Sequence, residues 1–466
     1  MNKARVSLVL GAVLALVLAA CNSVQESGAL EAQASKGNLR LNVLLNTDAS
    51  PQVLAELGRY GQVRDVLEAI DGVTMNAKAD QLPAIRALPF VAAANPDAER
   101  YAAPIDTVAA TDFTNGLSTW DQDAINVTDF GTLDRQVEFA GSGVYVAVVD
   151  TGLVDSWRQF FPQERIAVEY AKSFGGGGGE RGKVSEQPNK WEHDTNSHGT
   201  HVTSTILGFS RLGTPINGTA PMATVIPVKV LNQNGSGWSS VVAAGIEYVG
   251  DLKAGPLKDS PVVINMSLGG PALDAMEQAA IDYAIEQGVI IVASAGNSGE
   301  AGMGYPGAYP PVISVAASGW VGEWTQASWW YKKDVPDPTD PEDFYITDFS
   351  SRELAGQDLD VAAPGSWIVG PYKLNSGNTP SYYYLGGTSM ASPHVAGIAA
   401  LMMEKNGSLT QAEVETILEG SAIPLAAGCR TITGPTGATE DVCWGTDATG
   451  AGLATADAAL AATSTP

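Results

Sequence analysis

The residues best suited to chemistry are an aspartate, a histidine, an asparagine and a serine that lie at the ends of predicted strands or at the starts of predicted helices. Asp150 closes the apolar run in VAVVDTG, and His198 lies in NSHGTHV. Asn297 follows an apolar run in SAGNSG, and Ser389 lies in GGTSMASPHVAG. A serine that attacks a carbonyl carbon needs a base for its proton, an acid that orients the base, and donors for the oxyanion. These residue types supply each of those parts.

Each residue alone also has a structural interpretation. Asp150 could cap a strand end, His198 could be a core histidine, and Ser389 could be a helix N-cap. The other histidines of these segments, His201 and His394, are interpreted as structural. The catalytic interpretation therefore depends on all the positions together.

The segments around these residues resemble those of a known family. The matching segments are VAVVDTGL, NSHGTHV, VINMSLGGP, SAGNSG, GYPG, DVAAPG and GTSMASPHVAG. Any one of them could occur by chance, but they follow one another in order within residues 118–425. The chain is therefore identified as a member of the subtilases, the subtilisin-like serine peptidases.

The resemblance implies a role for each matching residue. Asp150 would orient the imidazole, His198 would act as general base, and Ser389 would be the nucleophile. Asn297 and the backbone N–H of Ser389 would form the oxyanion hole. The implied activity is that of a serine endopeptidase acting on proteins or peptides.

Substrate-binding residues follow in the same way. Ser267, Leu268 and Gly269 resemble the backbone edge that pairs with an extended peptide. Gly296 and Gly304 resemble positions that line the first specificity pocket, and glycine at both implies a roomy pocket.

The sequence departs from the family pattern at some places. Thr203-Ser204 replace the usual small Ala-Gly pair after HGTHV, and residues 319–346 form a long insertion with four tryptophans. The loop FSRLGTPINGT lacks a clear set of calcium ligands. We therefore assign no metal site and expect no cofactor in the chemistry, although a structural calcium ion stays possible.

Hydrophobic runs predict the elements that position these residues. Near-continuous apolar runs alternate with helical stretches, which is typical of a parallel sheet covered on both faces. The runs are VYVAVVD, TVIPVKVL, PVVINMSL, GVIIVASAG and PVISVAA. Ligands of such sheets bind at the carboxyl ends of the strands, where Asp150 and Asn297 lie. The expected fold class is α/β: a subtilisin-like three-layer fold with a mainly parallel central sheet.

The N-terminal region predicts export. Residues 1–21 combine Lys3 and Arg5 with a short apolar run that ends at Cys21, as in a bacterial lipoprotein signal peptide. We expect a secreted or cell-envelope protein, with possible lipid anchoring through Cys21; a plain signal peptide is the alternative. Residues 22–37 are small and polar and predict a flexible tether.

Further units flank the peptidase domain of residues 118–425. Residues 38–102 predict two β-α-β passes, a small α+β unit whose order and position resemble the inhibitor-like prodomain of subtilases. The protein's own prodomain is thus an expected partner. Residues 103–117 predict a linker with the maturation site, and residues 426–466 a C-terminal tail.

Composition limits the other partners. The formal net charge of −25 disfavours binding to nucleic acid and to anionic lipid surfaces. Cys429 and Cys443 predict a disulfide in an oxidising environment. We expect a monomer.

Two alternatives stay open. A non-catalytic, peptide-binding surface lipoprotein could use the same scaffold, although every catalytic position is filled. A serine-carboxyl peptidase would carry Glu at the position of His198 and Asp at that of Asn297, so both residues count against that class.

Overall fold

The computed structural model describes residues 37–109, 118–129, 135–175, 190–331, 334–336, 338–375 and 379–466. The chain forms two compact units, Met1–Asp97 and Ala98–Pro466. The predicted leader with Cys21, the tether up to residue 36, and part of the predicted linker lie outside the described residues. Among the described residues, no helix has the length and hydrophobicity needed to cross a membrane.

The small unit is an antiparallel sheet with two short helices. Its sheet has the strand order β2-β3-β1-β4. Leu41 and Val43 on β1 and Val73 and Met75 on β3 are buried in its core. The elements, in chain order, are β1 (Asn38–Leu45), α2 (Pro51–Leu57), β2 (Gly61–Leu67), β3 (Gly72–Lys78), α3 (Leu82–Arg86) and β4 (Val91–Pro96). This β-α-β-β-α-β order confirms the predicted elements.

The large unit is built on a mainly parallel sheet with the strand order β16-β15-β14-β13-β7-β11-β8, to which β17 adds beside β15. Its parallel strands include the five predicted runs, because strands covered on both faces are apolar throughout. These strands are β7 (Tyr145–Asp150), β11 (Thr224–Lys229), β13 (Val262–Met266), β14 (Val289–Ser294) and β15 (Ile313–Trp320). The remaining strands are β8 (Lys172–Ser173), β16 (Phe344–Ile346) and β17 (Val361–Pro364).

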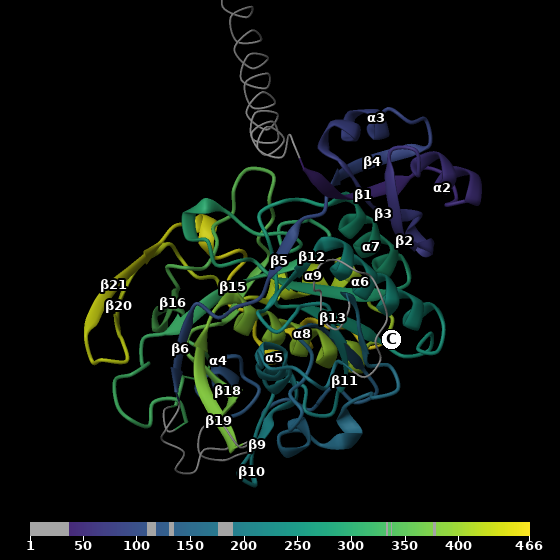
Figure 1. Ribbon diagram of the computed structural model, residues 1–466. Coiled ribbons are helices and arrows are strands. Elements are labelled where there is room, and N and C mark those ends of the chain that lie inside the picture. Colours follow the sequence, from purple (N-terminus) through teal and green to yellow (C-terminus); the bar gives the residue numbers. More distant parts are fainter. Residues whose placement is uncertain are drawn as a thin grey trace, which may run out of the picture. The chain divides into compact units, whose positions relative to one another are not determined.

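Helices cover this sheet in two pairs (Figure 1). Helix α5 (His198–Leu207) packs against α8 (Thr388–Lys405), and α6 (Ser239–Ala254) packs against α7 (Ala275–Glu286). Both pairs contact strands of the parallel sheet. The expected α/β architecture is therefore confirmed.

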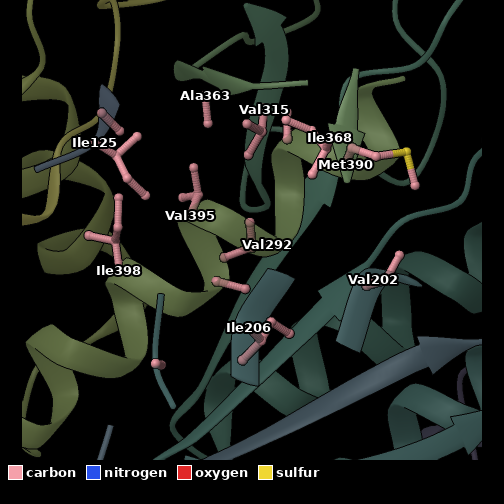
Figure 2. Packing of buried hydrophobic residues seen from close by; sticks show 14 of the residues in the cluster. Ile125, Val202, Ile206, Val292, Val315, Ala363, Ile368, Met390, Val395 and Ile398 are labelled. Atoms are coloured by element: carbon pink, nitrogen blue, oxygen red, sulfur yellow. The ribbon is translucent and has the colours of Figure 1, made fainter. Parts of the chain in front are cut away.

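Helix α8 lies at the centre of the hydrophobic core, and its residues from Thr388 to Met403 are all buried. Figure 2 shows Met390, Val395 and Ile398 of α8 among side chains of the neighbouring strands. A helix that is apolar on all sides is stable only in such surroundings. The start of α8, which carries Ser389, is thus held rigidly.

The C-terminal residues are part of the large unit rather than a separate tail. Leu453 and Leu460 are buried in the core, and α10 (Ala456–Ala462) packs against α8. Strands β20 (Gly428–Thr433) and β21 (Thr439–Trp444) form a hairpin whose Cys429 and Cys443 are joined by a disulfide.

The boundary between the units also differs from the prediction. It falls after Asp97 rather than after residue 102. Residues beyond it form two short strands of the large unit, β5 (Glu99–Tyr101) and β6 (Asp106–Ala109). Part of the predicted linker is therefore ordered.

Candidate active site

Asp150 and His198 form a buried hydrogen-bonded pair. Asp150 ends β7, and His198 is the first residue of α5. Nδ1 of His198 lies 2.9 Å from both carboxylate oxygens of Asp150, and the N–H of Thr151 donates to Oδ1 at 2.6 Å. A carboxylate at Nδ1 favours the tautomer with its proton there, which leaves Nε2 as an acceptor. The pair is therefore arranged as a base and its orienting acid.

Ser389 lies in the first turn of α8, and its hydroxyl faces a neighbouring strand. Its Oγ donates to the carbonyl of Ser267 at 3.2 Å, while Oγ of Ser267 donates to the carbonyl of Ser389 at 2.8 Å. Nε2 of His198 is buried, and within the described part of the chain it has no hydrogen-bond partner. The serine–histidine hydrogen bond is thus not formed here. Such bonds often form only when substrate is bound.

Asn297 lies beside the same helix start. Its Oδ1 accepts hydrogen bonds from the N–H and the hydroxyl of Thr388, both at 2.9 Å. This leaves Nδ2 to donate, and an ideal Cβ on Gly387 would lie 3.6 Å from it. The N–H of Ser389 belongs to the first turn of α8, where backbone donors lack intrahelical acceptors. Both donors can stabilise an oxyanion next to Ser389.

A second layer of polar residues ties β7 to α5. The buried carboxylate of Asp194 accepts from the hydroxyl of Thr151 at 2.8 Å and from the N–H of Ser197 at 2.7 Å. The Thr151 hydroxyl accepts from the N–H of Gly199, and Nζ of Lys229 lies 3.7 Å from Asp194. Burial raises the pKa of Asp194, against the opposing charge of Lys229. Sequence reasoning missed this layer, although Thr151 directly follows Asp150 and Asp194 lies close to His198.

His201 has a structural role on α5. Its Nε2 donates to the carbonyl of Ile368 at 3.0 Å, and burial lowers its pKa to about 3, helped by the charge of His198. It is therefore neutral at physiological pH. The unexpected Thr203-Ser204 pair is satisfied within the helix, because both hydroxyls donate to carbonyls of the preceding turn.

His394 joins α8 to a buried carboxylate. Its Nε2 lies 3.0 Å from Asp121, and its Nδ1 lies 2.9 Å from the carbonyl of Met390. Burial opposes ionisation of Asp121, but the hydrogen bond and charge of His394 outweigh it and lower the pKa of this carboxyl. Because both ring nitrogens face acceptors, the imidazolium form satisfies both contacts.

The residues that follow the small unit cross the site as an extended strand. Strand β5 pairs with β12 (Ser236–Trp238) on one side. On the other side, Tyr101 exchanges two backbone hydrogen bonds of 2.9 Å with Gly269. The N–H of Ala102 donates to the carbonyl of Gly235 at 2.8 Å, and that of Ile105 to Gly386 at 2.8 Å.

A single antiparallel bridge relates this strand to the segment that Ser389 contacts. Tyr101 and Gly269 form an isolated bridge, and extending its register by two residues would place Ala103 opposite Ser267. The carbonyl of Ser267 is the one that Ser389 contacts. On this register the peptide bond after Ala103 would face Ser389.

The other predicted substrate-binding residues border this strand. Leu268 is buried between Ser267 and Gly269. An ideal Cβ on Gly296 would lie 3.1 Å from the nitrogen of Gly304, so these glycines are neighbours. A Cβ on Gly304 would in turn lie 3.5 Å from the nitrogen of Gly270.

The tryptophan-rich insertion packs into the core. Trp329 and Trp330 are fully buried, and Trp324 lies 4.9 Å from Tyr384 between ring centroids. Tyr384 belongs to β19 (Thr379–Gly386), the strand that leads into Ser389. The insertion therefore braces the strand that leads into Ser389.

A set of carboxylates fits a hard cation. Oxygens of Asp358, Asp360 and Glu415 lie within 4.8 Å of one another. Burial raises the pKa of Asp360 to about 8 and that of Glu415 to about 7. Oδ1 of Asp360 is buried and lacks a hydrogen-bond partner among the described residues. Oxygen ligands of this kind suit calcium.

The fold and the site described above are both found in one protein family. A model of the Subtilase family matches residues 141–455. The chain belongs to this family, and it is a serine-type peptidase with a subtilisin-like fold.

Individual relatives agree with the family. Subtilisin DY of Bacillus licheniformis is 34% identical over 291 residues, which cover 62% of this chain and 86% of that protein. Thermitase of Thermoactinomyces vulgaris is 34% identical over 282 residues, which cover 60% and 82%. The solved structure of fervidolysin from Fervidobacterium pennivorans, a keratinolytic enzyme related to subtilisin, matches with a TM-score of 0.65 and 25% identity, covering 91% of this chain and 61% of that chain.

Proposed function

We propose that this protein is an exported serine endopeptidase that hydrolyses peptide bonds through an acyl-enzyme intermediate on Ser389. The observation that carries the proposal is the buried Asp150–His198 pair beside the helix start that holds Ser389. The strand of residues 98–109 is held on both sides of Ser389, by β12 and Gly269 before it and by β19 after it. A site that holds polypeptide both before and after Ser389 suits an endopeptidase, which cuts within a chain.

The proposed mechanism uses the residues in turn. Oγ of Ser389 attacks the substrate carbonyl carbon, and Nε2 of His198 takes the hydroxyl proton. Nδ2 of Asn297 and the N–H of Ser389 stabilise the oxyanion, while Asp150 stabilises the imidazolium. His198 then protonates the departing amine, and a water molecule activated by the same base hydrolyses the acyl-enzyme.

The protein would be made as a self-inhibited zymogen. The strand of residues 98–105 occupies the edges that a substrate would use, so the enzyme is blocked until this strand is cut or displaced. We propose that the unit of residues 38–97 is the inhibitory prodomain, and that the protein cuts itself within residues 103–117. Export, and anchoring through Cys21, follow from the leader. A structural calcium ion would bind at Asp358, Asp360 and Glu415.

The test compares the wild-type proform from residue 22 with Ser389→Ala. The mass of each chain is followed over time together with its hydrolysis of casein. Wild type should shorten near residues 103–117 and digest casein, and Ser389→Ala should stay at full length and be inert. Ser260→Ala, a serine change remote from the site, is the matched control and should behave as wild type.

Other outcomes have clear meanings. If Ser389→Ala digests casein as fast as wild type, Ser389 is not the nucleophile. If both proteins stay inert with calcium added and after cleavage of the linker by another protease, the peptide-binding alternative replaces the endopeptidase.

A further inference from the structure

Within β5 (Glu99–Tyr101), the buried side chain is a charged one. Glu99 and Tyr101 of β5 are exposed, whereas Arg100 between them is fully buried. Its Nε donates to Oε1 of Glu277 at 2.9 Å, and its Nη2 donates to Oε2 of the same carboxylate. Such a bidentate pair is stronger and more directional than a hydrogen bond between neutral groups.

The surroundings complete a site shaped for a guanidinium group. Nη2 of Arg100 also donates to the carbonyl of Ala272 at 3.1 Å, and Nη1 donates to the carbonyl of Glu99 at 3.0 Å. An ideal Cβ on Gly270 would lie 2.3 Å from the carbonyl oxygen of Glu99 and 3.1 Å from Nη1, so the absence of a side chain there admits the strand. We call Gly270, Ala272 and Glu277 the Arg100 site.

The position of Glu277 favours its charged form. It lies in the first turn of α7, whose N-cap Asp274 accepts from the N–H groups of Met276 and Glu277. The positive end of a helix dipole stabilises a carboxylate in this turn. With Arg100 in place, the Glu277 side chain is only 2% exposed. An ionised carboxylate in such surroundings strongly favours a cationic partner.

We infer that Glu277 is a specificity-determining residue that selects arginine in substrates. This inference rests on the proposed function, because Arg100 then belongs to a strand that leaves the site and substrates replace it. Backbone pairing holds any peptide in the same register. The selected arginine would therefore be the third residue before the residue whose carbonyl is attacked, as Arg100 is relative to Ala103.

The test uses the self-processed wild-type enzyme and quenched fluorescent peptides. Each peptide copies residues 98–107 but has alanine in place of Pro104. The peptides carry arginine, lysine or citrulline at the position of Arg100. Citrulline keeps the shape of arginine without its charge. We expect kcat/KM for the arginine peptide to exceed that for the citrulline peptide by about 10- to 100-fold, as for the loss of hydrogen bonds to a charged group. Lysine, which lacks the planar fork, should lie between them.

Variants assign the effect to Glu277. Glu277→Gln should bring the ratio of kcat/KM for the arginine peptide to that for the citrulline peptide close to one. Glu286→Gln changes an exposed glutamate of the same helix and should keep the wild-type ratio. Should Glu277→Gln fail to fold or mature, equal cleavage of the arginine and citrulline peptides by wild type would still refute the inference.

The results that overturn the inference differ from those that overturn the proposed function. Equal cleavage of the arginine and citrulline peptides by wild type, or an unchanged ratio in Glu277→Gln, would refute the role of Glu277 while the endopeptidase stands. Wild type that cleaves neither casein nor any of the peptides would refute the endopeptidase, and this inference with it.

Discussion

The buried carboxyl of Glu323 gives the protein a pH-dependent stability that a single substitution should remove. Glu323 lies in the tryptophan-rich insertion and is almost completely buried. One oxygen accepts from the N–H of Trp320 at 3.0 Å, and the other accepts from the hydroxyls of Tyr345 at 2.9 Å and Ser366 at 2.8 Å. Burial raises its pKa from 4.5 to about 8, although these hydrogen bonds oppose the shift.

The raised pKa of Glu323 determines in which direction, and by about how much, the free energy of unfolding changes with pH. Below pH 4.5 the carboxyl is protonated in both the folded and the unfolded chain. Between 4.5 and about 8 only the folded chain keeps the proton, so the free energy of unfolding falls as the pH rises. At about 1.4 kcal/mol for each pH unit, the loss across this window amounts to about 5 kcal/mol.

Glu323→Gln keeps the shape of the side chain and cannot ionise. In a Ser389→Ala background, which prevents self-digestion, guanidinium unfolding followed by tryptophan fluorescence at pH 5 and at pH 9 measures the difference. The parent should lose up to about 5 kcal/mol more than the Gln variant between these pH values. Glu286→Gln should follow the parent. Parallel losses in the parent and in Glu323→Gln would show that the carboxyl does not take up a proton on folding.

Further predictions concern the oxyanion hole, a buried ion pair and the disulfide. Asn297→Ala should lower kcat by about 10²–10³ with little change in KM, measured by steady-state peptide hydrolysis. Asp121→Asn should lower the free energy of unfolding near pH 7 by about 3–5 kcal/mol because it removes one partner of the buried contact between Asp121 and His394. Since the folded pKa of Asp121 is lowered, that deficit should shrink as the pH falls below 3.8, and a constant deficit would exclude the ion pair as its cause. Replacing Cys429 and Cys443 together by serine should cost about 3 kcal/mol in denaturant unfolding, and an unchanged midpoint would contradict a stabilising role.

The sequence predicted the central sheet well because of how that sheet is covered. Strands buried on both faces, such as Val262–Met266 and Val289–Ser294, are mostly apolar without alternation, and this makes them easy to find in the sequence. Asp150 and Asn297 follow such strands, so their place at the carboxyl edge of the sheet was also predictable. The contact between Ser389 and Ser267 was not, because it depends on a side-chain rotation within the formed site.

Long-range polar contacts were beyond sequence reasoning. Arg100 and Glu277 are 177 residues apart, and each stands in a segment whose local pattern is ordinary. An arginine in a polar stretch and a glutamate in the first turn of a helix are both typical of exposed positions. Their pairing follows only from the strand register that brings β5 beside Gly269.

The backbone pairing of this strand explains why residues 103–117 were predicted as a linker. It also explains why selection among substrates would come from sites that bind side chains. A strand that adds to existing edges is held by its backbone, so residues 98–105 need no alternation of polar and apolar side chains to be ordered. For the same reason the edges at Gly235, Gly269 and Gly386 would bind most extended peptides alike. Discrimination between substrates would therefore come from places where a side chain is buried, and for β5 that place is the site where Arg100 pairs with the carboxylate of Glu277 on α7.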